Sequence, residues 1–372
     1  MRLLLPRLPI AFGVFGLVWG AWQAILPDLA ARFDLTTGPL GLMLTAGFAV
    51  SLPVMLATGR IIDRVGPGPG IAFTALGMAG GLIVVGTLTS LPVLILGVIL
   101  FAAGSGAFDV AINGAALGDE RWSRPARLTL LHAAFSAGGV IGALGGGALV
   151  GGGTSFALVY PGLAVAAAAV AALALTTTWH LRGSQQGVPR PIAMAILPLA
   201  AIAGLAFLAE GSMETWSAIY LRDVLGAPAF VGALGPGAFH AAMLAGRLVG
   251  AAVAGSLGSP ATLLVSGAMT VGGMAVALLG PAPATAIAGM AVAALGVSFV
   301  VPVVVSLAGR RAGAYAGRGA SYVLSLGYAG FLIGPSLVGV LGELAGLRIG
   351  LVVVPVAASV IVVASRSRAA RG

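Results

Sequence analysis

Three carboxylates lie inside long apolar stretches of this 372-residue chain: Asp109, Glu210 and Glu214. Asn113 follows Asp109 by one helical turn, and Glu214 follows Glu210 likewise, so each pair shares a face if its segment is helical. Ionisable groups in such stretches are costly and are therefore functional hypotheses. Burial favours the neutral, protonated carboxyl, which allows these groups to exchange a proton near neutral pH. The alternative interpretation is structural, with each carboxylate paired to an arginine or hydrogen-bonded across helices.

Other polar and aromatic side chains in the apolar stretches could contact a small solute. Three aromatic residues offer faces for stacking, although anchoring at a lipid interface is the alternative. Two side-chain amides could form neutral hydrogen bonds, and a histidine follows in the fifth apolar stretch. The candidate substrate-binding residues are Trp22, Gln23, Asn113, His132, Trp216 and Tyr328.

Several chemistries are excluded by residue types and patterns that the sequence lacks. The chain has no cysteine, which rules out disulfides, thiolate metal sites and cysteine nucleophiles. Neither a metal-ligand spacing nor a nucleophile–base arrangement occurs, so we expect no metal, no cofactor and no enzyme. The net charge of +9 is spread thinly between the apolar stretches. No basic cluster is interleaved with aromatic residues, so a nucleic-acid partner is not expected.

The composition and the apolar runs indicate an all-α membrane protein. Charged residues make up 8% of the chain, against roughly 25% in soluble domains. A spanning helix needs about 20 mostly apolar residues. Runs of that size predict twelve transmembrane helices near residues 8–30, 38–58, 70–89, 91–117, 127–150, 155–178, 191–221, 228–254, 261–280, 284–308, 319–344 and 347–365.

The arginines predict the orientation in the membrane. All 19 basic residues are arginines, and the gaps on one side of the predicted membrane hold only Arg32, Arg222 and Arg348. Cytoplasmic loops of membrane proteins carry an excess of Lys and Arg. We therefore expect a multi-pass protein of the cell membrane with both termini in the cytoplasm and the lipid bilayer as a partner.

The least apolar stretch divides the chain into two halves. Residues 179–191 contain Gly, Ser, Gln and Pro and are predicted to be a cytoplasmic linker between bundles at residues 1–178 and 192–372. Residues 21–25 (AWQAI) recur as residues 215–219 (TWSAI), and the fourth and fifth runs resemble the tenth and eleventh. Parallel six-helix repeats are typical of one transporter architecture, with substrate held between the halves near the midplane.

The segment after the second run reads GRIIDRVG, from Gly59 to Gly66. It resembles the G-x-x-x-D-R-x-G signature of the major facilitator superfamily. The resemblance implies a gating role for Gly59, Asp63, Arg64 and Gly66, with the aspartate pairing to neighbouring helix ends in the outward-open state. The equivalent segment of the second half lacks the Asp-Arg pair, and Arg247, one turn earlier, is a candidate substitute.

Within that superfamily the sequence most resembles the fucose-type sugar:proton symporters and uncharacterised bacterial proteins near them. The similar residues are Asp109 to Asn113 in the fourth run, Leu131-His132 in the fifth and Glu210 to Ser212 in the seventh. The symporters also have an acid in the first helix, near Gln23, that this chain lacks. The resemblance implies a monomeric carrier that moves a small polar or sugar-like solute with protons.

Two other functions remain open. The segment from Gly138 to Gly147 resembles a glycine-rich exporter motif with alanine in place of proline, whereas Gly330 to Pro335 keeps the proline. A proton-driven exporter of an amphipathic compound is therefore one alternative. A non-transporting receptor or scaffold on the same fold is the other, and it would not need paired carboxylates inside the membrane.

Overall fold

Apolar runs of this length form helices in lipid because a helix satisfies its backbone N–H and C=O groups internally. A computed structural model describes residues 7–87, 90–118, 125–176 and 189–371, and within these ranges the regular structure is helical, with no strand. Twelve described segments are long and apolar enough to cross a membrane. The predicted all-α membrane fold is therefore confirmed.

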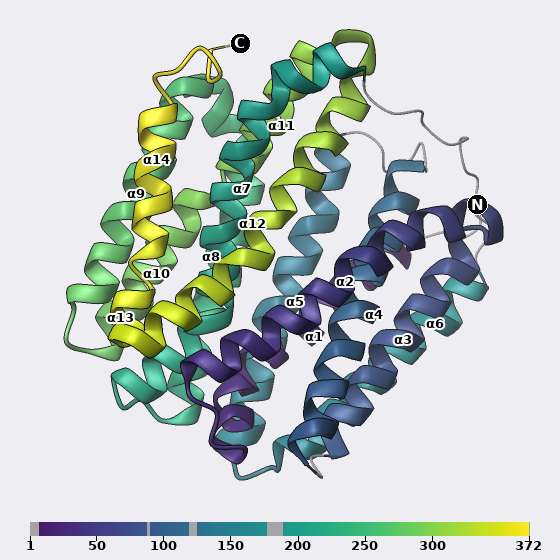
Figure 1. Cartoon of the computed structure of the whole chain (residues 1–372), viewed down its shortest axis with the longest axis vertical. Helices are drawn as coiled ribbons and strands as arrows, with labels where there is room; N and C mark the ends of the chain where they lie inside the picture. The colour runs from purple at the N-terminus through teal and green to yellow at the C-terminus, as the bar shows by residue number, and fades with distance from the viewer. Residues whose placement is uncertain (1–6, 88–89, 119–124, 177–188, 372) are drawn as a thin grey trace. The chain divides into compact units, whose positions relative to one another are not determined.

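The first half of the chain forms the helices α1 (Arg7–Arg32), α2 (Thr37–Val65), α3 (Pro67–Thr87), α4 (Leu91–Gly118), α5 (Pro125–Gly151) and α6 (Phe156–Leu175) (Figure 1). The second half forms α7 (Arg190–Ile219), the π-helical turn η1 (Tyr220–Val224), α8 (Ala229–Leu257), α9 (Ser259–Leu279), α10 (Pro283–Val297), α11 (Val300–Ala312), the 3₁₀ turn η2 (Gly313–Tyr315), α12 (Ala316–Ala345), α13 (Leu347–Gly350) and α14 (Val353–Ala364). Two spans are broken once: α10 with α11 forms one, and α13 with α14 forms another.

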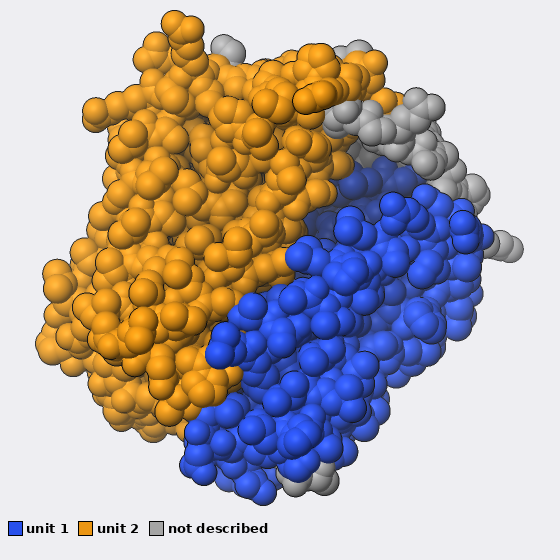
Figure 2. Space-filling view, in the orientation of Figure 1, with its two compact units in different colours: residues 1–35, 42–184 blue, residues 36–41, 185–372 orange. Residues whose placement is uncertain are grey.

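The chain divides into two compact units, coloured separately in Figure 2: residues 1–35 with 42–184, and residues 36–41 with 185–372. Residues 179–188 of the predicted 179–191 linker lie outside the described part of the chain. Residues 36–41, which include the first turn of α2, belong to the second unit. There the Glu343 carboxylate accepts hydrogen bonds from the Gly38 N–H at 2.8 Å and from the Thr37 hydroxyl at 3.1 Å. An anion at a helix N-terminus is favourable because the first N–H groups there lack helical partners.

In the first unit, α1 and α5 lie side by side with their backbones in close contact (Figure 1). A Cβ added to Gly142 of α5 would overlap the carbonyl of Leu17, and one added to Gly20 of α1 would overlap the carbonyl of Gly139. Small residues permit such approaches between membrane helices. The glycine-rich segment of the fifth predicted run therefore has a packing role.

The second unit repeats this arrangement between α7 and α12. A Cβ on Gly330 would overlap the carbonyl of Gly204, and one on Gly334 would lie 2.5 Å from the carbonyl of Leu208. The glycines of the fifth and eleventh spans thus pack in the same way against the first and seventh. This correspondence supplies a physical reason for the sequence similarity between the halves.

Candidate functional site

Asp109 and Asn113 form a polar pair on α4 of the first unit. Both side chains are half-buried. The Asn113 amide donates hydrogen bonds to the Asp109 carboxylate oxygen Oδ1 at 2.8 Å and to the Asp109 main-chain carbonyl at 3.0 Å. Asp109 is the one ionisable residue in the sequence of α4. The pair therefore combines a carboxylate that can exchange a proton with an amide that can bind a polar solute.

The predicted binding residues of α1 lie in the interior of the first unit. Trp22 is 3% exposed, and its ring centroid lies 4.7 Å from that of Phe101 and 5.9 Å from that of Tyr160. Gln23 is 1% exposed. These surroundings favour a packing role for Trp22, and contact with substrate stays a prediction for both residues.

His132 of α5 lies against α1. Its ring is half-buried and meets the ring of Phe12 edge-on, with the centroids 5.4 Å apart. The structure therefore places His132 in the first unit beside an aromatic side chain, on a different helix from Asp109.

Glu210 and Glu214 lie on one face of α7, in the second unit. They are 6% and 7% exposed, respectively, in a helix whose surroundings are mostly apolar. Val224, where this span ends, is about 20 Å further along the helix than Glu210. Glu210 is therefore well inside the span, and Glu214 lies one turn nearer its end, about 15 Å from Val224.

Arg247 of α8 is half-buried, and α8 packs against α7, the helix that carries both carboxylates. His240, about two helical turns before Arg247 on α8, is 1% exposed. We call Glu210, Glu214 and Arg247 the charge cluster of the second unit. Arg247 lies three residues before the end of its candidate membrane span, Ala229–Gly250, and α8 itself continues to Leu257. Its predicted gating role stays a prediction.

The sequence indicates the two glutamates and the arginine separately, but it does not show that their helices pack against each other. The sequence does indicate that the three residues lie in consecutive apolar spans that run in opposite directions. Among the described residues, no group of three or more His, Asp or Glu side chains is placed to hold a metal ion.

The two remaining predicted aromatics also lie in the second unit. Trp216 is fully buried, and its indole N–H donates to the main-chain carbonyl of Pro335 at 2.9 Å. Tyr328 is half-buried between Phe207 and Phe331, at centroid distances of 5.2 and 6.1 Å. Trp216 therefore joins α7 to α12, whereas Tyr328 contacts one aromatic ring of α7 and one of its own helix. A substrate contact stays a prediction for both.

The signature from Gly59 to Gly66 is mostly helical. Its first seven residues form the last turns of α2, and the chain reverses at Gly66, whose φ of +86° favours glycine. Asp63 and Arg64 are exposed. No hydrogen bond or ion pair joins the side chain of Asp63 to another residue in the described ranges. The aspartate's predicted pairing with neighbouring helix ends therefore stays a prediction.

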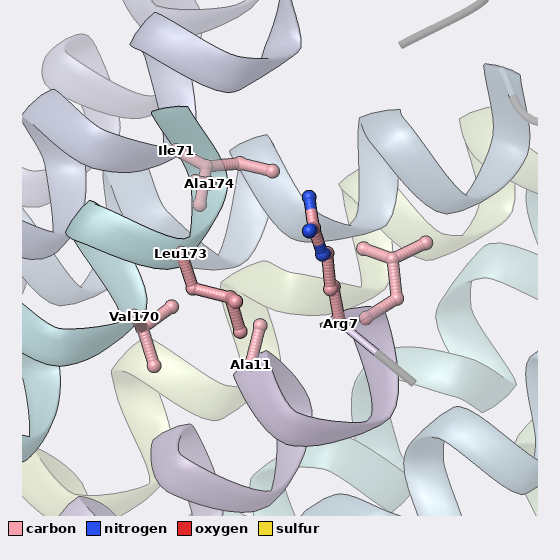
Figure 3. Close-up of a pocket in the computed structure, with 7 residues that line it drawn as sticks. Arg7, Ala11, Ile71, Val170, Leu173 and Ala174 are labelled. Atoms are coloured by element: carbon pink, nitrogen blue, oxygen red, sulfur yellow. The ribbon is translucent and has the colours of Figure 1, made fainter. Parts of the chain in front are cut away.

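Two cavities of the first unit do not include these candidate residues. One, of about 10 Å³, lies beside Arg7 and is lined by Ala11, Ile71, Val170 and Leu173 among others (Figure 3). That volume holds at most one water molecule. The other is an open apolar groove of about 350 Å³ along α1 and α5. The first cavity is too small for a solute, and the second is lined by apolar side chains and glycines, which would not orient a hydrophilic solute.

Comparison with known families identifies the fold. The Major Facilitator Superfamily profile matches residues 8–335. The chain therefore belongs to the Major Facilitator Superfamily, whose members are transporters. This finding confirms the family that the Gly59–Gly66 signature predicted.

The relatives of this chain include proteins named only as transporters or membrane proteins. An uncharacterised transporter of this superfamily from Yersinia pestis is 29% identical over 349 residues, which are 91% of this chain and 89% of that protein. The membrane protein MosC of Rhizobium meliloti is 27% identical over 93% of this chain and 85% of its own length.

Solved structures with the same fold are more distant in sequence. A bacterial homologue of the human lysosomal transporter Spinster has a TM-score of 0.75 and 17% identity, covering 97% of this chain and 96% of that one. A variant of the E. coli fucose:proton symporter, with one asparagine replaced by alanine, has a TM-score of 0.66 and 16% identity, with 97% of each chain covered. The nucleoside transporter NupG has a TM-score of 0.72 and 13% identity, over 96% of this chain and 98% of that one.

Proposed function

We propose that this protein is a monomeric secondary active transporter that moves a small polar, sugar-like solute together with protons by alternating access. Asp109, Glu210 and Glu214 exchange the protons, and Asn113 contributes a hydrogen bond to the solute. Membership of the superfamily supports transport itself. The solute class and the proton coupling rest on the side chains of this chain.

The observation that carries the proposal is the hydrogen-bonded pair of Asp109 and Asn113. The amide holds the carboxylate in one orientation at 2.8 Å, and no other ionisable residue occurs in α4. A carboxylate in an apolar helix is energetically costly, and a role in a proton pathway would explain why the chain keeps it there. The amide and carboxylate together also offer the donors and acceptors that hydroxyl groups require.

Names of structural neighbours agree with a polar solute, because one is a fucose:proton symporter and another a nucleoside transporter. The glycine segment of α5, which resembled an exporter motif, packs against α1 and therefore does not favour export over import. Export of an amphipathic compound and a non-transporting role remain as outcomes of the test below.

A stabilisation screen followed by transport measurements tests the proposal. A bound solute raises the unfolding temperature of the purified protein by mass action. We expect a sugar or a similar polyhydroxylated solute to do so, and an imposed inward proton gradient to drive its accumulation in proteoliposomes. Stabilisation by lipophilic cations with proton-driven efflux would instead support an exporter. Normal folding with no ligand and no flux would support a receptor or scaffold.

The proposed orientation has both termini and the 179–191 linker in the cytoplasm. It rests on the uneven distribution of the arginines. A reporter that is active only in the cytoplasm should therefore be active when fused after Gly372 or inserted at Gln186. A reporter fused between α1 and α2, near Asp34, should be inactive and serves as the control. Activity at Asp34 together with silence at Gly372 would invert the orientation.

A further inference from the structure

Residues 365–371, which follow α14, form a compact turn in the second unit. Ser365 and Ala370 are 3% and 0% exposed, respectively. The main chain folds back on itself, because the Ala370 N–H donates a hydrogen bond to the carbonyl of Ser367 at 3.2 Å. Figure 1 shows this segment beyond the end of α14, close to the mark for the C-terminus. We call residues 365–371 the C-terminal turn.

Arg311 of α11 holds the C-terminal turn in place. Its Nη2 atom donates hydrogen bonds to three main-chain carbonyls of the turn, at 2.7 to 2.9 Å: those of Arg368, Ala369 and Arg371. Hydrogen bonds from a charged donor are stronger than those between neutral groups. All three bonds go to the main chain, so they fix the backbone of the turn without using its side chains.

The side chains of the turn present positive charge at the surface. Its three arginines are all exposed: Arg366, Arg368 and Arg371. The Arg371 guanidinium also reaches the main-chain carbonyl of Arg366, at 3.5 Å. The turn therefore gathers three guanidinium groups on a short, folded segment whose backbone is already bound.

Arg310 extends this basic surface to the neighbouring helix ends. It is exposed, and its guanidinium donates hydrogen bonds to the hydroxyl of Ser306 on α11, at 2.7 Å, and to that of Ser259, the first residue of α9, at 3.3 Å. No Asp or Glu occurs in the sequences of α9, α11, α14 or the turn. We call Arg310 and the three arginines of the turn the C-terminal basic surface.

The C-terminal turn begins where a membrane span ends. The span Leu347–Ala364 contains 18 residues, which as a helix cover about 27 Å, close to the thickness of roughly 30 Å of a bilayer's hydrocarbon core. The turn starts at the next residue, Ser365. Its arginines therefore lie at the depth of the lipid headgroups, towards which long basic side chains near a helix end extend.

We propose that the C-terminal basic surface binds the phosphate headgroups of anionic phospholipids. The arginines of the turn contact the phosphates, and Arg311 is the positioning residue that holds the turn. Arginine clusters next to a membrane helix attract anionic lipids, and the planar guanidinium matches the geometry of a phosphate. A soluble phosphate has the same chemistry, but the position of the turn at the end of a span favours the phosphates of the bilayer. This inference does not depend on the transported solute or on proton coupling.

Lipid titrations of the purified protein test the proposal. In a nonionic detergent, we expect phosphatidylglycerol to bind more tightly than phosphatidylcholine with the same acyl chains, as counted by native mass spectrometry. Replacing Arg366, Arg368 and Arg371 together with Gln should weaken phosphatidylglycerol binding about tenfold or more, because each arginine near an anionic surface contributes roughly fivefold. This triple variant should fold normally, since Arg311 binds only the main chain of the turn.

Arg348→Gln is the matched control for loss of a single charge. Arg348 is also exposed, but it lies at the opposite end of the same span. Its replacement should change the affinity for phosphatidylglycerol less than about twofold, whereas Arg368→Gln should lower it roughly fivefold. Equal phosphatidylglycerol binding by the triple variant and the wild type would overturn the proposal. Competition by glycerol 3-phosphate at the same concentration as the lipid would also overturn it and assign the surface to a soluble phosphate.

Arg311→Gln tests the positioning role. Amide hydrogen exchange of residues 365–371 should become at least about tenfold faster in this variant, and it should stay at the wild-type rate in the triple variant, which keeps the bonds to the main chain. The preference for phosphatidylglycerol over phosphatidylcholine should also fall, whereas a general loss of structure would weaken both lipids alike. Unchanged exchange and an unchanged lipid preference in Arg311→Gln would show that Arg311 does not position the turn.

Discussion

Asp109→Asn should abolish proton-driven accumulation of the substrate while leaving exchange of substrate down its own gradient largely intact. Asparagine has nearly the same shape as aspartate and can still hydrogen-bond with Asn113, which lies 2.8 Å from the carboxylate in the wild type. It cannot exchange a proton near neutral pH. Removing the proton site therefore removes the driving force without removing the conformational change.

Paired uptake and counterflow in proteoliposomes measure the two effects separately. We expect accumulation under an imposed pH gradient to fall at least about tenfold, a loss of some 1.4 kcal/mol of coupling free energy, with counterflow within about twofold of the wild type. Asp34→Asn is the control, because Asp34 is an exposed acid between α1 and α2 and asparagine tolerates its φ of 51°. Continued uphill accumulation by Asp109→Asn would show that Asp109 is structural.

Gly142→Val should prevent α1 and α5 from packing and greatly reduce the yield of folded protein. The first added carbon would overlap the carbonyl of Leu17 on the facing helix, and a backbone atom cannot move aside as a flexible side chain can. We expect a loss of roughly 3 kcal/mol or more, at the upper end for overpacked sites. Thermal unfolding in detergent and the monodisperse fraction on size-exclusion chromatography measure it.

Gly145→Val provides a control on the same helix. Gly145 lies three residues further along α5, and a Cβ added there meets nothing within 4 Å. Both variants make the same chemical change in the same helix, so propensity effects cancel. Equal stability of the two variants would mean that α5 and α1 are not in close backbone contact.

Much of the fold was predictable from the sequence, because a membrane allows few backbone structures. The lengths of the apolar runs predicted twelve spans, and the described part of the chain has twelve helical segments that meet the same requirement. The signature from Gly59 to Gly66 indicated the superfamily, whose profile matches residues 8–335. The face shared by Asp109 and Asn113 also followed from spacing alone, since helical periodicity is a local property.

The surroundings of each side chain depended on tertiary structure, because an apolar run looks much the same on every face. The sequence predicts that Trp22 and Trp216 contact the substrate. The structure buries both inside their own units, at 3% and 0% exposure. The glycines of α5 that resemble an exporter motif lie against the backbone of α1, so they have a packing role.

The charge cluster shows the same division most clearly. The sequence by itself determined that Glu210, Glu214 and Arg247 lie in consecutive apolar spans, where ionised groups are costly. Only the packing of α7 against α8 brought the helix that carries the arginine against the helix that carries both carboxylates. The physical reason is that electrostatic interaction depends on distance and local dielectric, and residues far apart in sequence acquire both only when helices pack.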